Sequence, residues 1–419
     1  MTPPTLPARR RAKTLSLLLA GALYSGAVLA PHAAAESPQD PWYMDTWRVQ
    51  EMWEQATGEG VTVAVVDTGV DASLPHLEGQ VLEGIDLNID PDGAHVDTQG
   101  HGTIMAGAIA GTGEGGGIQG IAPGAKILPI RVDKGLEFDF GQEDRWAQAI
   151  EYAVESGAKV INFSVGAEGV SGSPDGLEAA IAEAARNDVL IFAATGNSGE
   201  SRNIISRSAD FPGVVGVGAV DRNGDHAAFS VHGSRVALSG PGIDVPGYCP
   251  DGSWEEACLI ERGGTSAATA LASASAALIW SAHPDWTKNQ VLRALAQTAE
   301  GDGQRDDYVG FGMIRPDRVI LEEGVDPGEP DVNPMFDAYE RALDPPVSPE
   351  PVPEEEPEEP AEEDAVPEER EQERSDAAAS GAGGNGGSSN TPALIGVVGG
   401  VIILGGVAAV VIVSRRRTA

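Results

Sequence analysis

The sequence predicts an α/β domain with a three-layer αβα arrangement, in which helices cover both faces of a mostly parallel sheet. Five short, mostly apolar runs are typical of strands that are buried on both sides. These runs are residues 61–66, 127–132, 160–165, 189–194 and 214–220. Helical stretches lie between them, at residues 102–110, 144–156 and 175–186. In parallel sheets of this kind the functional residues gather at the carboxyl ends of the strands.

The globular part of the chain is predicted at residues 36–321, which hold nearly all the aromatic residues and all five apolar runs. Its first segment, residues 42–57, has a partly helical pattern whose tryptophans are expected to pack into the core. A further helix is expected from Gly264 to about Ala282, where a run rich in alanine follows a glycine turn. The size suits one large α/β domain.

Residues 1–35 have the three parts of a secretory signal peptide. A basic segment at residues 9–13 precedes an apolar run at residues 15–30, and three alanines at residues 33–35 provide a cleavage site. The globular domain is therefore expected to be exported, and the export route stays open.

Residues 322–392 are rich in Pro, Glu, Gly and Ser and are predicted to form a disordered linker. Residues 322–376 contain 22 acidic side chains and three arginines, a large part of the formal net charge of −37. Such a segment has few apolar groups to bury and repels itself, so we expect an extended, solvated stalk. A chain this acidic is not expected to bind nucleic acid, because phosphates would repel it.

Residues 393–413 are an apolar stretch that is long enough to cross the hydrocarbon layer as one transmembrane helix. The tail, residues 414–419, contains three arginines and is expected to stay in the cytoplasm. The sequence therefore predicts a cell-membrane protein with a single span, an extracellular domain and a cytoplasmic C-terminus.

Cys249 and Cys258 are the two cysteines of the chain, and a Pro/Asp/Gly turn lies between them. In an exported domain, an even number of neighbouring cysteines predicts a disulfide that closes a short surface loop. We predict no metal site, because the remaining histidines have no accompanying acidic or cysteine ligands. Five of them are expected to be surface or loop residues: His76, His95, His226, His232 and His283.

Three motifs place a carboxylate, an imidazole and a hydroxyl at strand ends or helix starts. Asp67 ends the first strand and is followed by Thr and Gly; His101 lies between two glycines; Ser266 follows Gly-Gly-Thr. Each motif alone is weak, because a serine after a glycine turn is more often a helix cap. Together they predict a nucleophilic serine with a general base and an orienting carboxylate. Asp71 and Asp97 are alternative carboxylates, but only Asp67 ends a strand.

These motifs resemble, in kind and order, the three signatures of the subtilisin-like serine peptidases, the S8 family. The resemblance covers residues 42–321 and extends to the stretches 121–123, 160–166 and 193–197. It implies a subtilisin-like fold and a serine endopeptidase activity on peptide or protein substrates.

The resemblance implies a role for each site residue. Ser266 is the expected nucleophile, and His101 acts as general base and then as general acid. Asp67 is expected to orient the imidazole and to stabilise its cation without accepting the proton. Asn197 matches the family's oxyanion donor, acting together with the backbone N–H of Ser266.

Two backbone edges are expected to bind an extended peptide through main-chain hydrogen bonds. They are formed by Ser164, Val165 and Gly166 and by Ala193 and Ala194. Their small, uncharged side chains suggest a roomy pocket for an uncharged substrate side chain.

The layout also resembles that of the mycosins, membrane-tethered subtilisin-like peptidases of type VII secretion systems. The shared features are the signal peptide, the Pro-rich linker, the C-terminal span with its arginine tail, and the stretch 128–132. This resemblance implies a processing protease with secretion-system components as partners, although membrane-anchored relatives without a secretion role have the same layout. The short distance between the signal peptide and Asp67 predicts that there is no large inhibitory propeptide.

A calcium ion and a non-enzymatic role are the alternatives that the sequence leaves open. Residues 74–79 lack the usual His-Pro-Asp of the family, so a structural calcium ion is not predicted, and no other cofactor is expected. The domain could instead be a catalytically silent cell-surface binding or scaffold module of a secretion system. The intact triad together with Asn197 favours the enzyme, because a decayed domain has no reason to keep all four residues.

Overall fold

The computed structural model describes the folded part of the chain, namely residues 41–133, 141–166, 174–249 and 257–343. These residues belong to one compact unit, 1–348, and a second unit, 349–419, lies outside the described residues. The predicted signal peptide, transmembrane helix and cytoplasmic tail also lie outside them. Within the described ranges, no helix is long and apolar enough to cross a membrane.

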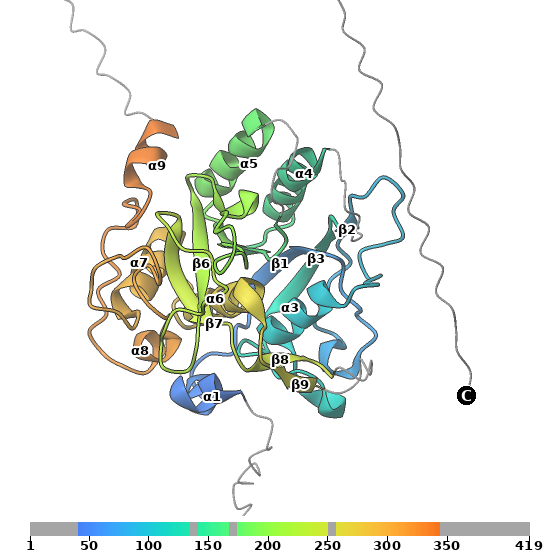
Figure 1. The fold of residues 1–419 in the computed structure, drawn as a ribbon, viewed down its shortest axis with the longest axis horizontal. Helices are drawn as coiled ribbons and strands as arrows, with labels where there is room; N and C mark the ends of the chain where they lie inside the picture. The colour runs from blue at the N-terminus through green and yellow to red at the C-terminus, as the bar shows by residue number, and fades with distance from the viewer. Residues whose placement is uncertain (1–40, 134–140, 167–173, 250–256, 344–419) are drawn as a thin grey trace, which may run out of the picture. The chain divides into compact units, whose positions relative to one another are not determined.

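A seven-stranded sheet forms the centre of the described unit (Figure 1). The strands lie in the order β2-β3-β1-β4-β5-β6-β7, and each neighbouring pair runs parallel. Their bounds are β1 Thr62–Asp67, β2 Ile85–Asp86, β3 Lys126–Arg131, β4 Val160–Phe163, β5 Leu190–Ala194, β6 Val214–Val220 and β7 Val236–Pro241. Five of these strands lie where the five apolar runs predicted them, which confirms the parallel α/β prediction.

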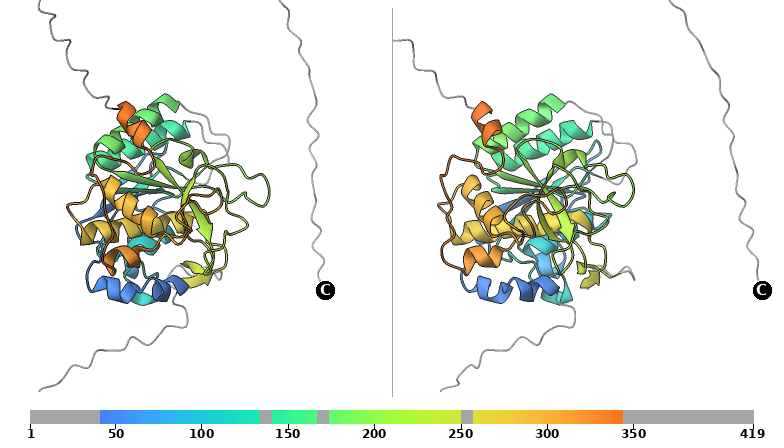
Figure 2. Two further views of the ribbon diagram at one scale, coloured as in Figure 1. Left: turned by 90° about the vertical axis from the view of Figure 1, so that its left-hand side faces the viewer. Right: turned by 60° about the vertical axis from the view of Figure 1, so that its left-hand side comes forward.

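Helices cover both faces of the sheet, as the turned views show (Figure 2). Against one face pack α3 (His101–Ala110), α6 (Gly264–Ala282) and α7 (Lys288–Thr298), and against the other α4 (Gln142–Glu155) and α5 (Pro174–Arg186). Within β1, Val63 and Val65 belong to the first of these cores, whereas Ala64 and Val66 belong to the second. Because the strand is buried on both sides, its middle residues are all apolar, and this made the strand recognisable in the sequence.

Shorter elements surround these three layers. They are α1 Trp42–Thr46, α2 Val49–Trp53, α8 Pro316–Ile320, α9 Asp337–Leu343, the 3-10 helices η1 Pro75–Leu77, η2 Glu114–Gly116 and η3 Arg207–Ala209, and the antiparallel pair β8 Val245–Tyr248 and β9 Ala257–Ile260. The helical segment expected at residues 42–57 is divided into α1 and α2, because Arg48 between them has a left-handed φ of 50°.

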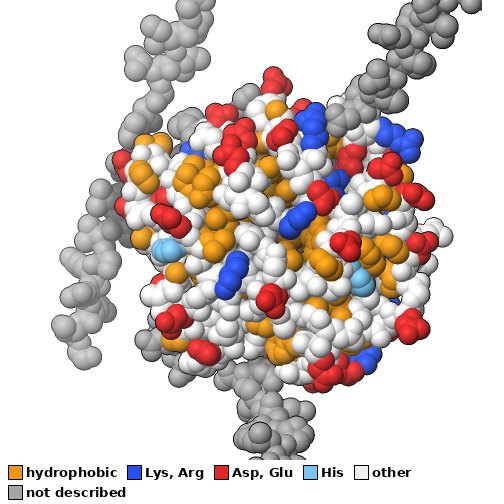
Figure 3. Space-filling view, turned by 180° about the vertical axis from the view of Figure 1, so that it is seen from behind, with side chains coloured by type: hydrophobic (Ala, Val, Ile, Leu, Met, Phe, Trp, Pro, Cys, Tyr) orange, Lys and Arg blue, Asp and Glu red, His pale blue; other side chains and the backbone are white. Residues whose placement is uncertain are grey.

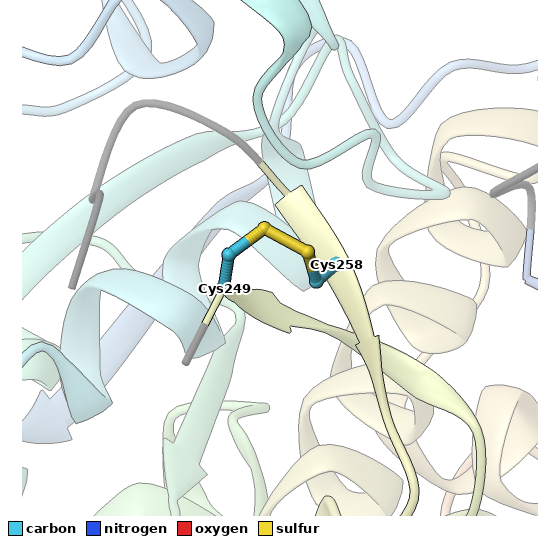
Figure 4. Close-up of a disulfide and its surroundings, with 2 residues drawn as sticks. All are labelled: Cys249 and Cys258. Carbon is cyan, nitrogen blue, oxygen red and sulfur yellow. A yellow bond between two sulfur atoms is a disulfide. The ribbon is translucent and has the colours of Figure 1, made fainter. Parts of the chain in front are cut away.

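The predicted disulfide between Cys249 and Cys258 is present in the structure. It joins the end of β8 to β9, as Figure 4 shows. The turn between the two cysteines, residues 250–256, lies outside the described residues.

The folded unit continues past residue 321, where the disordered linker was predicted to begin. Residues 322–343, here called the C-terminal strap, instead pack along α7 and end in α9. The guanidinium of Arg293 donates hydrogen bonds of 2.7 Å to the carbonyl oxygens of Pro327 and Val332. The prediction was wrong here because the strap is held through its backbone carbonyls, which composition does not reveal.

His76 also departs from the prediction that it is a surface or loop residue, because it lies in η1 with no solvent exposure. Neither of its ring nitrogens has a hydrogen-bond partner among the described residues, and burial lowers the pKa of the imidazole. A Cβ added at Gly117 would lie 2.1 Å from its Nδ1, so the loop packs directly on the ring. His76 is therefore part of the packing of this region.

Figure 3 shows the face of the unit opposite to that of Figure 1. Asp and Glu side chains are scattered over it, with Lys and Arg side chains lying singly among them. On this face of the described chain the cations do not gather into the continuous basic patch that nucleic-acid binding requires.

Candidate active site

The three predicted catalytic residues lie on three different elements at the carboxyl edge of the sheet. Asp67 is the last residue of β1, His101 is the first residue of α3, and Ser266 lies in the first turn of α6. Two helix N-termini therefore open toward the end of a central strand. The free N–H groups of such N-termini favour negative charge, which suits a site where an oxyanion forms.

A hydrogen bond joins the carboxylate of Asp67 to the imidazole of His101. Their Oδ1 and Nδ1 atoms are 2.7 Å apart, and Asp67 is fully buried. The same Oδ1 accepts the backbone N–H of Thr68 at 2.8 Å, which fixes the carboxylate in one orientation. The bond sets the tautomer of His101, because Nδ1 carries the hydrogen and leaves Nε2 as the acceptor.

Gly102 allows the close approach of α3 to the end of β1. A Cβ at this position would lie 2.1 Å from the carbonyl oxygen of Gly69 and 3.0 Å from the Cβ of Asp67. Any side chain would therefore push the helix away from the strand and lengthen the bond between Asp67 and His101.

The surrounding carboxylates determine the charge state of His101. Burial, the largest influence, lowers the pKa of the imidazole, but the negative charge of Asp67 and its hydrogen bond outweigh it. Asp97 and Asp133 add to the rise. The pKa of His101 is therefore raised above its ordinary value, so the ring holds a proton more firmly than a free imidazole does.

Ser266 is almost buried, with 7% of its surface exposed, and its hydroxyl donates a hydrogen bond of 3.2 Å to the carbonyl oxygen of Ser164. In return, the hydroxyl of Ser164 donates to the carbonyl oxygen of Ser266 at 3.2 Å. The residues after β4 thus lie directly against the first turn of α6. Gly264, with a φ of 81°, provides the turn into the helix.

Asn197 lies next to this turn, with its side chain oriented by Thr265. Its Oδ1 accepts the backbone N–H of Thr265 at 2.9 Å and the hydroxyl of the same residue at 3.2 Å. This leaves Nδ2 as the free donor of the amide. The guanidinium of Arg262 donates to the carbonyl oxygen of Asn197 at 3.3 Å and lies 4.5 Å from the ring centre of Phe229.

A cavity of about 190 Å³ lies beside Ser266. Its lining has no charged side chain; it consists of Ser164, Gly166, Ala194, Gly196, Asn197, Ser198, Ile204, Ser206, Thr265 and Ser266. Most of these residues are small, so the cavity suits an uncharged side chain of a substrate.

The predicted substrate-binding residues are divided between this cavity and the core. Ser164, Gly166 and Ala194 line the cavity, whereas Val165 and Ala193 are buried in the core between the sheet and its helices. Sequence reasoning missed Ile204 and Ser206, which close the cavity from a loop after β5. The loop has no motif that would have revealed them.

The two alternative carboxylates do not bind the imidazole. Asp97 accepts hydrogen bonds from Thr68 and from the start of α3, and Asp71 accepts one from Ser73 at 2.6 Å. Of the three candidates, Asp67 is the carboxylate that binds His101. We find no group of three or more potential metal ligands in the described ranges.

Comparison with known proteins identifies the family. The model described as the Subtilase family matches residues 58–312, more than half of the chain. The chain belongs to the subtilase family. It is therefore a member of a family of serine endopeptidases.

Among the curated relatives of this subtilase is a thermostable alkaline protease from Halalkalibacterium halodurans. It is 34% identical over 281 residues, which are 67% of this chain and 73% of that protein. Subtilisin E from Bacillus subtilis is 34% identical over 261 residues, which are 62% of this chain and 65% of that protein. The chain thus spans slightly less than two thirds of the length of subtilisin E.

Solved structures of mycosins are also similar to this subtilase. The MycP3 protease from the type VII (ESX-3) secretion system has a TM-score of 0.59 and 28% identity, covering 69% of this chain and 90% of that one. MycP1 from Mycobacterium smegmatis has a TM-score of 0.60 and 26% identity, covering 71% and 88%. These similarities confirm the predicted subtilisin-like fold and the predicted resemblance to mycosins.

Proposed function

We propose that this subtilase is a membrane-anchored extracellular serine endopeptidase with a mycosin-like processing role. The observation on which the catalytic part rests is the 2.7 Å bond between buried Asp67 and His101, at the edge of the sheet where Ser266 lies in the first turn of α6. Membership of the subtilase family supports the same reaction.

In the proposed mechanism, the Oγ of Ser266 attacks the scissile carbonyl carbon while Nε2 of His101 accepts the hydroxyl proton. The proton then passes to the leaving amine, and the acyl group stays on Oγ until water, activated by the same imidazole, releases it. The hydroxyl of Ser266 binds the Ser164 carbonyl in the free protein and must rotate toward His101. Catalytic hydrogen bonds commonly tighten in this way when substrate binds.

Asn197 and the backbone N–H of Ser266 are the proposed donors to the oxyanion. Both Asn197 and Ser266 line the same cavity, and the bond from Thr265 to Oδ1 leaves the Nδ2 donor of Asn197 free. Donors that are oriented before the reaction stabilise the tetrahedral intermediate without a cost of reorganisation.

The proposed substrate is an extended segment of a peptide or protein. Ser164, Gly166 and Ala194 all line the cavity, and their small side chains leave room for a peptide backbone, which supports binding by main-chain hydrogen bonds. The uncharged lining supports an uncharged side chain at the residue whose carbonyl is attacked.

The membrane anchor and the partners rest on the sequence and on the structural neighbours. Residues 393–413 support a single span with the domain outside and the arginine tail in the cytoplasm. The solved neighbours include proteases named for type VII secretion systems, which supports components of such a system as partners. A catalytically silent binding or scaffold module on the same stalk is the competing proposal.

Hydrolysis of an unfolded protein substrate separates the two proposals. Purified full-length protein in detergent should cleave it, Ser266→Ala should not, and Ser275→Ala should retain activity. Ser275 is the matched control because it is buried in the same helix and binds only the carbonyl of Leu271 among the described residues. If the wild type cleaves no better than Ser266→Ala, the silent module is the correct proposal.

Protease protection on intact cells tests the orientation. An added protease should cut within residues 344–392 and release the domain, while an epitope after residue 419 stays protected. Cleavage of that epitope on intact cells would contradict the proposed topology.

A further inference from the structure

Asp97 joins the strand that ends in Asp67 to the helix that begins with His101. Its Oδ1 accepts the hydroxyl of Thr68 at 2.9 Å. Its Oδ2 accepts the backbone N–H of Thr103 at 3.0 Å and the hydroxyl of Thr103 at 2.6 Å. One carboxylate therefore binds both sides of the pair formed by Asp67 and His101.

The hydroxyl of Thr68 also links the end of β1 to the start of α3. Its hydroxyl donates to Asp97 and accepts the backbone N–H of Gly102 at 3.0 Å. Thr68 directly follows Asp67, Gly102 directly follows His101, and only 3% of Thr68 is exposed. These hydrogen bonds thus involve Thr68, Gly102 and Thr103, which are one or two positions from Asp67 and His101.

We propose that Asp97 and Thr68 form a positioning unit that holds His101 in the geometry needed for proton transfer. This inference rests on the proposed function, because it assigns Asp97 and Thr68 a part in that same reaction. Among the described residues, neither side chain binds the imidazole or Ser266; both act through the placement of Asp67 and His101, and the backbone N–H of Thr68 also binds Oδ1 of Asp67.

An ordinary helix cap would not explain these contacts. Within α3, Asp97 accepts the N–H of Thr103, and it also accepts the N–H groups of Gln99 at 3.0 Å and Gly100 at 2.8 Å, which precede the helix. A cap binds the N–H groups of its own helix, whereas Asp97 also binds the residue after the catalytic aspartate. The link to Thr68 couples the position of the helix to that of the strand.

The negative charge of Asp97 also influences the pKa of the His101 imidazole. The groups that influence the pKa of His101 are Asp67, Asp97 and Asp133, and all three carboxylates raise it. Loss of the Asp97 charge therefore lowers the pKa of His101. This shift reports the lost charge, whereas the loss of kcat at unchanged KM, and its recovery in a variant that keeps the hydroxyl of Thr68, report the positioning.

Asp97→Asn is the first test, because the amide keeps the size of the side chain and one acceptor oxygen. We expect kcat for peptide hydrolysis to fall roughly 10- to 100-fold with KM nearly unchanged, since small misplacements of a catalytic group have effects of this size. The acid limb of the pH profile of kcat/KM should move to lower pH. Asp221→Asn is the matched control, because Asp221 also accepts backbone N–H groups but lies in an exposed turn far along the chain.

If Asp97→Asn does not fold, the variants Thr68→Val and Thr68→Ser test the inference instead. Valine has the shape of threonine without the hydroxyl, whereas serine retains the hydroxyl. We expect Thr68→Val to lose kcat as Asp97→Asn does, and Thr68→Ser to restore most of it. Equal kcat in the valine and serine variants would overturn the inference.

Labelling by a fluorophosphonate separates this inference from the proposed function. If the wild type is not labelled at Ser266, the proposed function fails. If the wild type is labelled and Asp97→Asn is labelled at the same rate, with an unmoved acid limb, the proposed function stands and the positioning role is wrong.

Discussion

Arg131 donates a hydrogen bond of 3.0 Å from Nε to the carbonyl oxygen of Thr68, so a buried cation holds the strand end that precedes the active site. Only 1% of Arg131 is exposed. Its Nη1 lies 3.2 Å from the carboxylate of Asp86, whose side chain is also buried. Within the sheet Arg131 pairs with Asp67, so it lies on the strand next to the one that ends in the proposed catalytic carboxylate.

Replacing Arg131 should destabilise the domain strongly. Arg131→Met leaves the charge of Asp86 buried without its cation, and we expect the free energy of unfolding to fall by about 3–5 kcal/mol. Urea unfolding at neutral pH measures the loss. Lys126→Met on the same strand is the control, because its exposed side chain should matter by less than about 1 kcal/mol. Equal losses in both variants would contradict the structural role of Arg131.

Removal of the Asn197 amide should affect the transition state more than substrate binding. We expect Asn197→Ala to lower kcat about 10²–10³-fold with a small change in KM, as for other oxyanion donors. Steady-state hydrolysis of a peptide measures both constants. Asn187→Ala, at an exposed asparagine after α5, should leave both unchanged. A rise in KM with unaltered kcat would instead place Asn197 in ground-state binding.

The pH dependence of kcat/KM should reflect the raised pKa of His101. The imidazole acts as a base only when it is neutral, so activity is lost as the pH falls through its pKa. Because the nearby carboxylates raise that pKa, the midpoint of the acid limb should lie above the ordinary histidine value of about 6.5. Circular dichroism over the same range excludes unfolding as the cause. A midpoint below that value in a folded protein would contradict the assignment of His101 as the base.

The C-terminal strap should be part of the stable domain. An ectodomain that ends at residue 321 loses the hydrogen bonds from Arg293, Asn289 and Gln290 to strap carbonyls, each worth about 1 kcal/mol. We expect its free energy of unfolding to be at least about 3 kcal/mol lower than that of an ectodomain ending at residue 348. Equal stability of the two would show that the strap is dispensable.

The parallel sheet and the positions of the three motif residues could be predicted, because both produce patterns within a few neighbouring residues of the sequence. A strand such as β1 is buried on two faces, so its residues 63–66 are all apolar, and Asp67 ends the strand directly after them. Glycines beside His101 and Ser266 mark sharp entries into helices. The signal is local in each case, so one sequence is enough to find it.

Other features depend on contacts between residues far apart in the sequence. The strap has the composition of a linker, yet α7 side chains bind its carbonyls and a few of its apolar residues, Val325, Met335 and Phe336, pack against the core. His76 reads as a loop residue, yet the loop around Gly117 and the ring of Tyr248 bury it. The role of Asp97 is hidden in the same way, because its bond to Thr68 spans 29 positions. The composition of a segment and its hydrophobic periodicity contain no information about such long-range contacts.

The central claim is that Ser266 is a nucleophile activated by His101. Its most direct test is to treat the purified protein with a fluorophosphonate and to locate the adduct by mass spectrometry of its peptides. We predict one adduct on Ser266 in the wild type, none in His101→Ala, and a normal adduct in His95→Ala, which removes an exposed histidine. No adduct on Ser266 of the folded wild type, or undiminished labelling in His101→Ala, would contradict the claim.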